Sequence, residues 1–296
     1  DDMRTVYNKN DAYRAFAVAV FTALGAQILL SIVFVFLPFA DEKGKLSDTA
    51  NWIMQALYTA LIGLSAFAYA AFTKTDFLKA AALNVKPSAA HTLWGIAIDV
   101  FLVVCMIPVN EWLMTAIEAA GLPRPSVDLP MQMFPLILVG SLLPAVTEEA
   151  VFRGTVAQGL AGGGVWKASL ISGALFALFH MNPAQTVHQF LFGALLAALA
   201  LRSGSTWTAS IVHLFNNLTA VALSFVPIPD DLYAKMLLPA FFVGAAGAAL
   251  CFFGYVKTTR SRQYEKEALL SSNALVLFVV ALLVCAALWV FSLVAE

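Results

Sequence analysis

The run MQMFPLILVGSLLPAVTEEAVFRGTVAQG, residues 131–159, is apolar enough to cross a bilayer, yet its second half holds two adjacent glutamates and an arginine. A spanning helix needs about 20 mostly apolar residues. Ionisable side chains at membrane depth are costly, and by default they mark a functional site. The stretch TEEAVFRG, residues 147–154, therefore predicts a polar site inside a membrane, built around Glu148, Glu149 and Arg153.

The whole chain has the composition of an integral membrane protein. Hydrophobic residues make up 61% of its 296 residues, charged residues only 12%, and the mean hydropathy is +0.83, whereas soluble domains carry about 25% charged residues. No long polar segment divides it, so we expect one membrane domain over residues 1–296. The net charge of −1 indicates no nucleic-acid partner. Cys105, Cys251 and Cys285 lie in apolar runs without CxxC spacing, which is typical of packing residues.

Nine apolar runs predict an all-α, polytopic transmembrane bundle of about eight to nine spanning helices. Only helices and closed barrels satisfy the backbone in lipid, and no alternating strand pattern suggests a barrel. The runs are 14–38, 51–73, 92–118, 131–159, 166–182, 185–201, 206–226, 232–256 and 272–294. The fifth and sixth runs are separated by little more than NPAQ, residues 182–185, and are the weakest as two full spans.

The Lys and Arg residues between the runs predict the orientation, because cytoplasmic loops are enriched in them. One side holds twelve: Arg4, Lys9, Arg14, Lys74, Lys79, Lys86, Lys167, Arg202, Lys257, Arg260, Arg262 and Lys266. The other side holds four: Lys43, Lys45, Arg124 and Lys235. We therefore expect a cytoplasmic N-terminus and an external C-terminus.

Spacing within TEEAVFRG separates the two glutamates. Glu149 and Arg153 are four residues apart with the acid first, the favoured order for an ion pair on one helix face. Glu148 is rotated by about 100° from Glu149 on a helix, so we expect one structural carboxylate and one that is free for chemistry. Pro144, one turn earlier, removes a helix hydrogen bond and is expected to open space there.

Two further motifs place histidines on the following helices. FALFH, residues 176–180, sets Phe176 and His180 at i and i+4, and HLFNN, residues 213–217, sets His213 and Asn217 likewise. A carboxylate and an imidazole can hold and deprotonate a water, while an imidazole N–H and an amide can donate to an oxyanion. We therefore predict a hydrolytic core within residues 131–226.

The estimated depths of these residues in the membrane agree only loosely with one another. At 1.5 Å per residue, Glu148, His213 and His180 lie roughly 16, 10 and 21 Å from the cytoplasmic ends of their helices. Tilted helices could reconcile these depths, which place the site in the cytoplasmic half or near the middle of the membrane.

Two other ionisable residues, His188 and Asp99, are expected to have structural roles. A lone histidine in a spanning helix is commonly an interhelical hydrogen bonder, and we expect this of His188. Asp99, near the cytoplasmic start of its run, is interpreted as an interfacial or structural carboxylate. A Glu–Arg pair alone could also be structural, but three polar motifs on neighbouring helices favour a site.

The three motifs, in this order, resemble those of the CPBP family, the type II CAAX prenyl endopeptidases and bacterial relatives often called Abi or bacteriocin-immunity proteins. The family pattern is EExxxR, then FxxxH, then HxxxN or HxxxD/B, and it is matched by EEAVFR (148–153), FALFH (176–180) and HLFNN (213–217). The resemblance covers residues 148–217. The family core is described with eight spanning helices, which implies that a ninth helix here is an addition at one end, namely 272–294.

The resemblance implies an intramembrane endopeptidase with a glutamate-based site, and we expect hydrolysis to need no cofactor beyond water. The catalytic residues that it implies are Glu148 and His180, which would activate the water, and His213 and Asn217, which would form the oxyanion hole. The supporting residues that it implies are Glu149, Arg153 and Phe176.

A metal site is the alternative chemistry for the same residues, since Glu148, His180 and His213 could together ligate zinc. No HExxH motif is present, and Arg153 beside the carboxylates would oppose a dication, so metal-free hydrolysis is favoured. Neither a GxSxG nor a GxGD motif points to serine or aspartyl chemistry.

Two functions from other classes are the alternatives. A non-catalytic bacteriocin-immunity or membrane-partner protein could keep these motifs without turnover. A proton-coupled transporter could relay protons through Glu149, Arg153 and the histidines, but it predicts internal repeats, and none is evident. The expected partners are a peptide or protein substrate, with prenylated CAAX-type peptides as one option, and membrane lipids.

Overall fold

The computed structural model describes residues 3–36, 46–124, 132–265 and 270–294. Within these ranges the chain is helical, and its β-like feature is an isolated bridge between Arg4 and Thr75. Each of the nine predicted runs contains a helix. The prediction of an all-α, polytopic membrane bundle is therefore confirmed.

The helix bounds, with η for 3₁₀ and π segments, are as follows. They are α1 (Lys9–Val35), α2 (Asp48–Phe72), α3 (Phe77–Ala80), α4 (Ala89–Ala119), α5 (Met133–Ile137), η1 (Leu138–Leu142), α6 (Leu143–Val151), η2 (Phe152–Ala157), α7 (Gln158–Leu160), η3 (Ala161–Gly163), α8 (Val165–Phe179), η4 (Pro183–Gln185), α9 (Thr186–Ser203), α10 (Thr206–Ser224), α11 (Asp230–Thr258) and α12 (Ser272–Val294).

Seven helical segments in the described ranges are long and apolar enough to cross a membrane. They are α1, α2, α4, the segment 133–163, the segment 183–203, α11 and α12. The two remaining helices of the predicted nine are α8, which has only 15 residues, and α10, whose histidine and asparagines lower its hydropathy. The chain is thus an integral, multi-pass membrane protein, in which α8 falls outside the seven because it is short and α10 because of its polar side chains.

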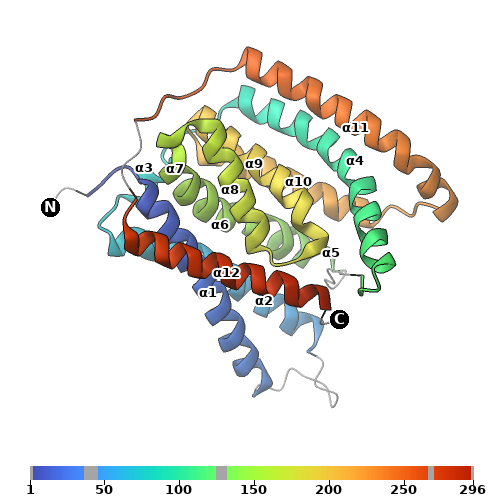
Figure 1. Ribbon diagram of the computed structural model, residues 1–296, viewed down its shortest axis with the longest axis horizontal. Coiled ribbons are helices and arrows are strands. Elements are labelled where there is room, and N and C mark those ends of the chain that lie inside the picture. The colour runs from blue at the N-terminus through green and yellow to red at the C-terminus, as the bar shows by residue number, and fades with distance from the viewer. Residues whose placement is uncertain (1–2, 37–45, 125–131, 266–269, 295–296) are drawn as a thin grey trace.

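The helices form three groups (Figure 1). Helices α4 and α11 pack side by side along one edge, α1, α2 and α12 lie along the opposite edge, and α6, α8, α9 and α10 lie between them. Small residues allow the close crossings, as is usual between membrane helices. A Cβ atom added at Gly173 of α8 would lie 2.6 Å from the Phe190 carbonyl oxygen of α9, and one at Gly244 of α11 would lie 2.7 Å from the Phe101 oxygen of α4.

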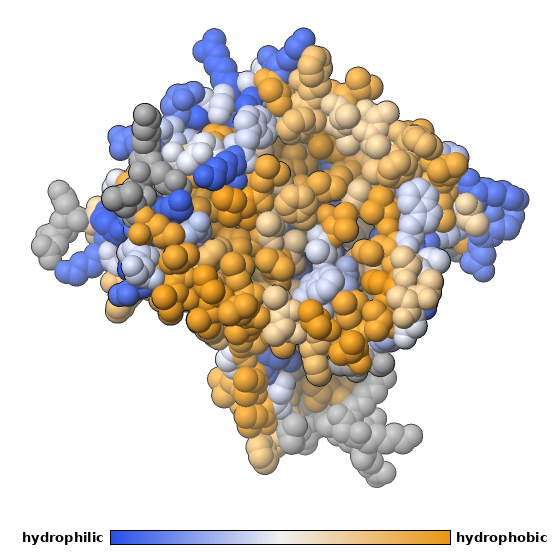
Figure 2. All heavy atoms as spheres, in the orientation of Figure 1, coloured by the Kyte–Doolittle hydropathy of each residue, from blue (hydrophilic) through white to orange (hydrophobic). Residues whose placement is uncertain are grey.

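The surface is apolar over the middle of the bundle. Figure 2 shows hydrophobic side chains across most of one face, with hydrophilic residues gathered toward its two ends. The exposed large apolar side chains include Leu250 on α11 and Leu283 on α12. Such a surface suits a hydrocarbon solvent, whereas which end faces the cytoplasm stays a prediction.

The three cysteines pack as predicted. Cys105 and Cys285 are buried, Cys251 is partly buried, and all three are free thiols. Cys105 and Cys285 belong to the main apolar core.

Candidate active site

The segment that carries the glutamates departs from α-helical geometry on both sides of them. The π segments η1 and η2 flank α6, and π turns are frequent at functional sites. Pro144, which has no N–H, lies just after η1. Here the Ser141 carbonyl oxygen accepts a hydrogen bond from Asn217 Nδ2, 3.3 Å away on α10. The irregular backbone near Pro144 thus supplies an acceptor for a predicted site residue.

Glu149 is the centre of a buried charge cluster. Its Oε1 accepts hydrogen bonds from Arg153 Nη1 at 2.6 Å and from His213 Nδ1 at 2.8 Å. The side chains of Glu149 and Arg153 are completely buried. Because a carboxylate with these two donors acts as the acceptor, the hydrogen of the neutral His213 ring lies on Nδ1. Its Nε2 then carries a lone pair and becomes a donor only when the ring is protonated.

Arg153 is held from a second side by α8 and α9. Its Nη2 donates to the Gly193 carbonyl oxygen at 3.1 Å, and its guanidinium carbon lies 4.2 Å from the centre of the Phe176 ring. The Phe176 ring also meets the rings of His180 and His213 edge to face, at 4.6 and 6.1 Å between centres. The Phe176 ring therefore packs against the Arg153 guanidinium and against both histidine rings.

Glu148 lies next to this cluster but, unlike Glu149, stays partly accessible. Its side chain keeps 17% of its exposure, while that of Glu149 keeps none. Its Oε2 lies 4.0 Å from His213 Nε2, and its charge also acts on His180. The structure therefore brings Glu148 and both motif histidines together, with Glu148 as the accessible carboxylate.

His180 and Asn217 have defined hydrogen-bonding states. His180 closes α8, and its Nδ1 lies 2.8 Å from the Phe176 carbonyl oxygen, which can only accept. The Nδ1 atom of His180 therefore carries a hydrogen, and in the neutral ring Nε2 offers a lone pair. Asn217 donates one amide hydrogen to Ser141 and accepts from Asn216, which leaves its second amide hydrogen for another acceptor.

Three residues that interact with the site residues were not predicted from the sequence: Ser141, Gly193 and Tyr58. The first two act through backbone carbonyls, which leave no signature in a sequence. Tyr58 of α2 interacts electrostatically with Glu148 and with Cys285, although it lies 90 positions before Glu148. Only the packing of α2 on α6 reveals it.

The structure places the two ionisable residues for which structural roles were expected, Asp99 and His188. Asp99 is completely buried, and neither of its oxygens has a hydrogen-bond partner among the described residues. Of the two interpretations, interfacial or structural, this burial favours the structural one, and Asp99 lies about 15 Å inside α4, which begins at Ala89. His188 of α9 interacts with the side chain of Asn216 of α10, as expected of an interhelical hydrogen bonder.

The described residues contain no group of three or more His, Cys, Asp or Glu side chains placed to hold a metal ion. Glu148, His180 and His213, the predicted zinc set, do not form such a group. The guanidinium of Arg153, 2.6 Å from Glu149, already supplies a positive charge to the cluster. The donor set thus fits a zinc ion poorly.

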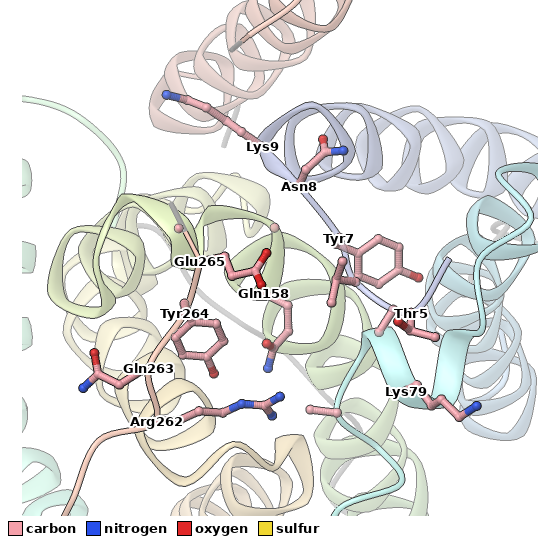
Figure 3. A pocket seen from close by; sticks show the side chains of 15 residues that line it. Thr5, Tyr7, Asn8, Lys9, Lys79, Gln158, Arg262, Gln263, Tyr264 and Glu265 are labelled. Carbon is pink, nitrogen blue, oxygen red and sulfur yellow. The ribbon is translucent and has the colours of Figure 1, made fainter. Parts of the chain in front are cut away.

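Two cavities lie away from these residues. A polar cavity of about 410 Å³ is bordered by the N-terminal segment, α3, α7 and residues 262–265, with Tyr7, Gln158, Tyr264 and Arg262 around it (Figure 3). Burial raises the pKa of Tyr7 and of Tyr264 to about 12. An apolar cavity of about 690 Å³ lies between α4, α8, α9 and α11. Neither is lined by Glu148 or the motif histidines, so the chemistry is assigned from the side-chain cluster.

Comparison with known proteins gives a family match for one segment of the chain. Residues 130–219 match the family model described as type II CAAX prenyl endopeptidase Rce1-like. No curated protein and no solved structure matches the chain. The family match confirms the resemblance predicted from the three motifs, all of which fall within the matched residues.

Proposed function

We propose that this protein, whose residues 130–219 form an Rce1-like type II CAAX prenyl endopeptidase domain, hydrolyses a peptide bond with a water activated by Glu148 and His180. The domain match indicates a CAAX-type intramembrane protease in general, and a peptide or protein substrate. One observation carries the finer proposal. Of two adjacent glutamates, one is buried in a charge cluster, and the other is accessible, lies 4.0 Å from His213 and interacts electrostatically with His180.

The activation step uses Glu148 and His180. The lone pair on His180 Nε2 accepts a hydrogen bond from the water, and the Glu148 carboxylate takes the water's proton as it attacks the carbonyl carbon of the substrate. A new C–O bond forms, and the carbonyl electron pair moves to its oxygen. When the C–N bond then breaks, Glu148 returns the proton to the departing amine, so the enzyme ends unchanged.

The developing oxyanion needs donors, and we assign His213 and Asn217 to that role. Since Nδ1 of His213 is bonded to Glu149, its Nε2 can donate only from the protonated ring. The Glu149 carboxylate stabilises that imidazolium, which gives the buried cluster a catalytic purpose. The second amide hydrogen of Asn217 completes a two-donor oxyanion hole.

The substrate that we propose is a membrane-associated peptide, for which a prenylated CAAX peptide is the first candidate because of the family match. We propose that no cofactor is required. A non-catalytic membrane-partner protein would cleave no peptide, and its partner function would survive the loss of Glu148, so this residue separates the two functions.

The test is peptide cleavage by the purified protein in detergent, read by mass spectrometry on prenylated and unmodified peptides. We expect cleavage to disappear in Glu148→Gln and to survive a strong chelator. Glu111→Gln is the matched control, because Glu111 is paired with Arg124 outside the site. Full cleavage by Glu148→Gln would overturn the mechanism, and loss in chelator with recovery in zinc would establish the metal alternative.

A further inference from the structure

The turn that presents His180 is conformationally unusual. Helix α8 ends at Phe179, His180 caps it, and Met181 follows with φ of +50°. A residue with a side chain adopts this left-handed region at a cost of about 1 kcal/mol or more. Asn182 and Pro183 then start η4, with Asn182 Oδ1 accepting from the Ala184 N–H at 2.8 Å. Such a turn persists only when surrounding contacts hold it in place.

One of these contacts comes from the far end of the sequence. The indole Nε1 of Trp289 on α12 donates to Thr186 Oγ1 at 2.7 Å, across 103 positions. Thr186 Oγ1 in turn donates to the Asn182 carbonyl oxygen at 3.0 Å. The same carbonyl accepts from the Gln185 N–H. A chain of two hydrogen bonds therefore runs from α12 to a peptide group two residues after His180.

Helix α12 is itself fixed well enough to serve as an anchor. Ala274, Phe278, Ala281 and Cys285 recur at helical spacing and pack on the rest of the bundle. The Phe278 ring stacks on Tyr13 of α1 at 4.2 Å between centres, and Ser271 N–H, just before α12, donates to Asn10 Oδ1 at 2.7 Å. Trp289 lies one turn beyond this stripe. The anchor lies outside residues 130–219, the segment that the family model matches.

We propose that Trp289 and Thr186 are positioning residues, through which α12 fixes the turn that aims His180 at the water site. The proposal rests on the proposed function for its catalytic consequence, but its structural consequence can be measured without any substrate. Loss of the indole N–H frees the Thr186 hydroxyl and loosens residues 180–186. A loosened His180 lowers the rate of the chemical step and leaves substrate binding nearly unchanged, because His180 acts on the water.

The test compares Trp289→Phe with Trp207→Phe in the full-length protein. Trp207 Nε1 also makes one indole hydrogen bond, 2.8 Å to the Leu83 oxygen, away from the turn. In Trp289→Phe we expect faster amide hydrogen exchange in residues 180–186, and a kcat about fivefold lower, as one lost hydrogen bond implies. The KM should stay within about twofold, as should both constants in Trp207→Phe.

Thr186 supplies the second pair of variants, which decides the proposal if Trp289→Phe does not fold. Thr186→Ser keeps the hydroxyl and should retain wild-type exchange and kcat. Thr186→Val removes both bonds, and adding Trp289→Phe to it should have no further effect, since the two act in series. Unchanged exchange over residues 180–186 in Trp289→Phe or in Thr186→Val would overturn the proposal. So would an equal change in Trp207→Phe. Turnover that is insensitive to Glu148→Gln would instead overturn the proposed function, and the exchange data would still decide the positioning role.

Discussion

The bundle buries two carboxylates completely, Glu149 on α6 and Asp99 on α4, and their surroundings are opposite. Glu149 accepts from a guanidinium and an imidazole within 2.8 Å. Asp99 has no hydrogen-bond partner among the described residues, and apolar neighbours such as Ile98 and Leu102 flank it along the helix. A buried charge is tolerated when it is paired and hydrogen-bonded, whereas an isolated acid in apolar surroundings is accommodated in its neutral form.

The difference shows which buried acid belongs to a site. Glu149 accepts from Arg153 of η2 and from His213 of α10, and Arg153 in turn donates to Gly193 of α9, so the cluster ties the helix of Glu149 to α9 and α10 while it orients His213. Asp99 has no such partners among the described residues and so links no helices. Burial alone therefore does not mark function, whereas burial with converging partners next to an accessible Glu148 does.

The largest expected effect is on turnover, and it tests whether Glu148, next to the buried cluster, carries out the chemistry. Glu148→Gln removes the proton acceptor for the water and should lower kcat about a thousandfold, as expected for general-base catalysis. The free energy of unfolding should change little, because Glu148 is outside the buried cluster. The measurement is kcat on a cleaved peptide together with unfolding in mixed micelles. A large drop in the free energy of unfolding of Glu148→Gln, in addition to its loss of kcat, would show that Glu148 is also structural.

Arg153→Met should have the largest effect on stability. It leaves the Glu149 charge buried beside His213 alone, and breaking a buried ion pair destabilises by about 3–5 kcal/mol. Arg124→Met is the matched control, because the Arg124–Glu111 pair is well exposed and contributes about 0–1 kcal/mol. Unfolding of both variants in mixed micelles measures the difference. Similar losses in the two would mean that the Glu149 cluster is not a structural centre.

The sequence was sufficient for the elements and motifs, because both depend on local patterns. Each of the nine apolar runs contains a helix in the described residues, seven segments of which are long and apolar enough to span, and the spacing of Glu149 and Arg153 predicted their ion pair. Tertiary contacts carry no such pattern. The bond between Glu149 and His213 joins residues 64 positions apart, and it changes which hydrogen His213 can offer.

Depth was the weakest sequence estimate, for a geometric reason. A count of 1.5 Å per residue separates His180 from His213 by about 11 Å in depth. The structure places both rings against Phe176. The count assumes straight, full-length spans, whereas α8 has 15 residues and π segments interrupt the helix of Glu148.

A smaller effect, of the opposite sign, is expected at Asp99. Asp99→Leu replaces an unpartnered buried acid with an apolar side chain of similar size and should stabilise the protein by about 1–3 kcal/mol. Asp99→Asn is the control, since it keeps a polar group in the same place and should give no such gain. Both are measured by unfolding in mixed micelles. A destabilised Asp99→Leu protein would reveal a partner for Asp99, and the contrast with Glu149 would then fail.

The smallest effect concerns His188, which lies between the two extremes because it has one partner. Its interaction with Asn216 joins α9 to α10. Hydrogen bonds between membrane helices contribute about 0.6 kcal/mol on average. A double-mutant cycle of His188→Phe and Asn216→Leu should give a coupling energy of that size in unfolding experiments. Turnover by His188→Phe should change little, since the water site is assigned to Glu148 and His180. A loss of kcat as large as that of Glu148→Gln would place His188 in the chemistry. Partnership across helices would then no longer separate structural from catalytic histidines in this bundle.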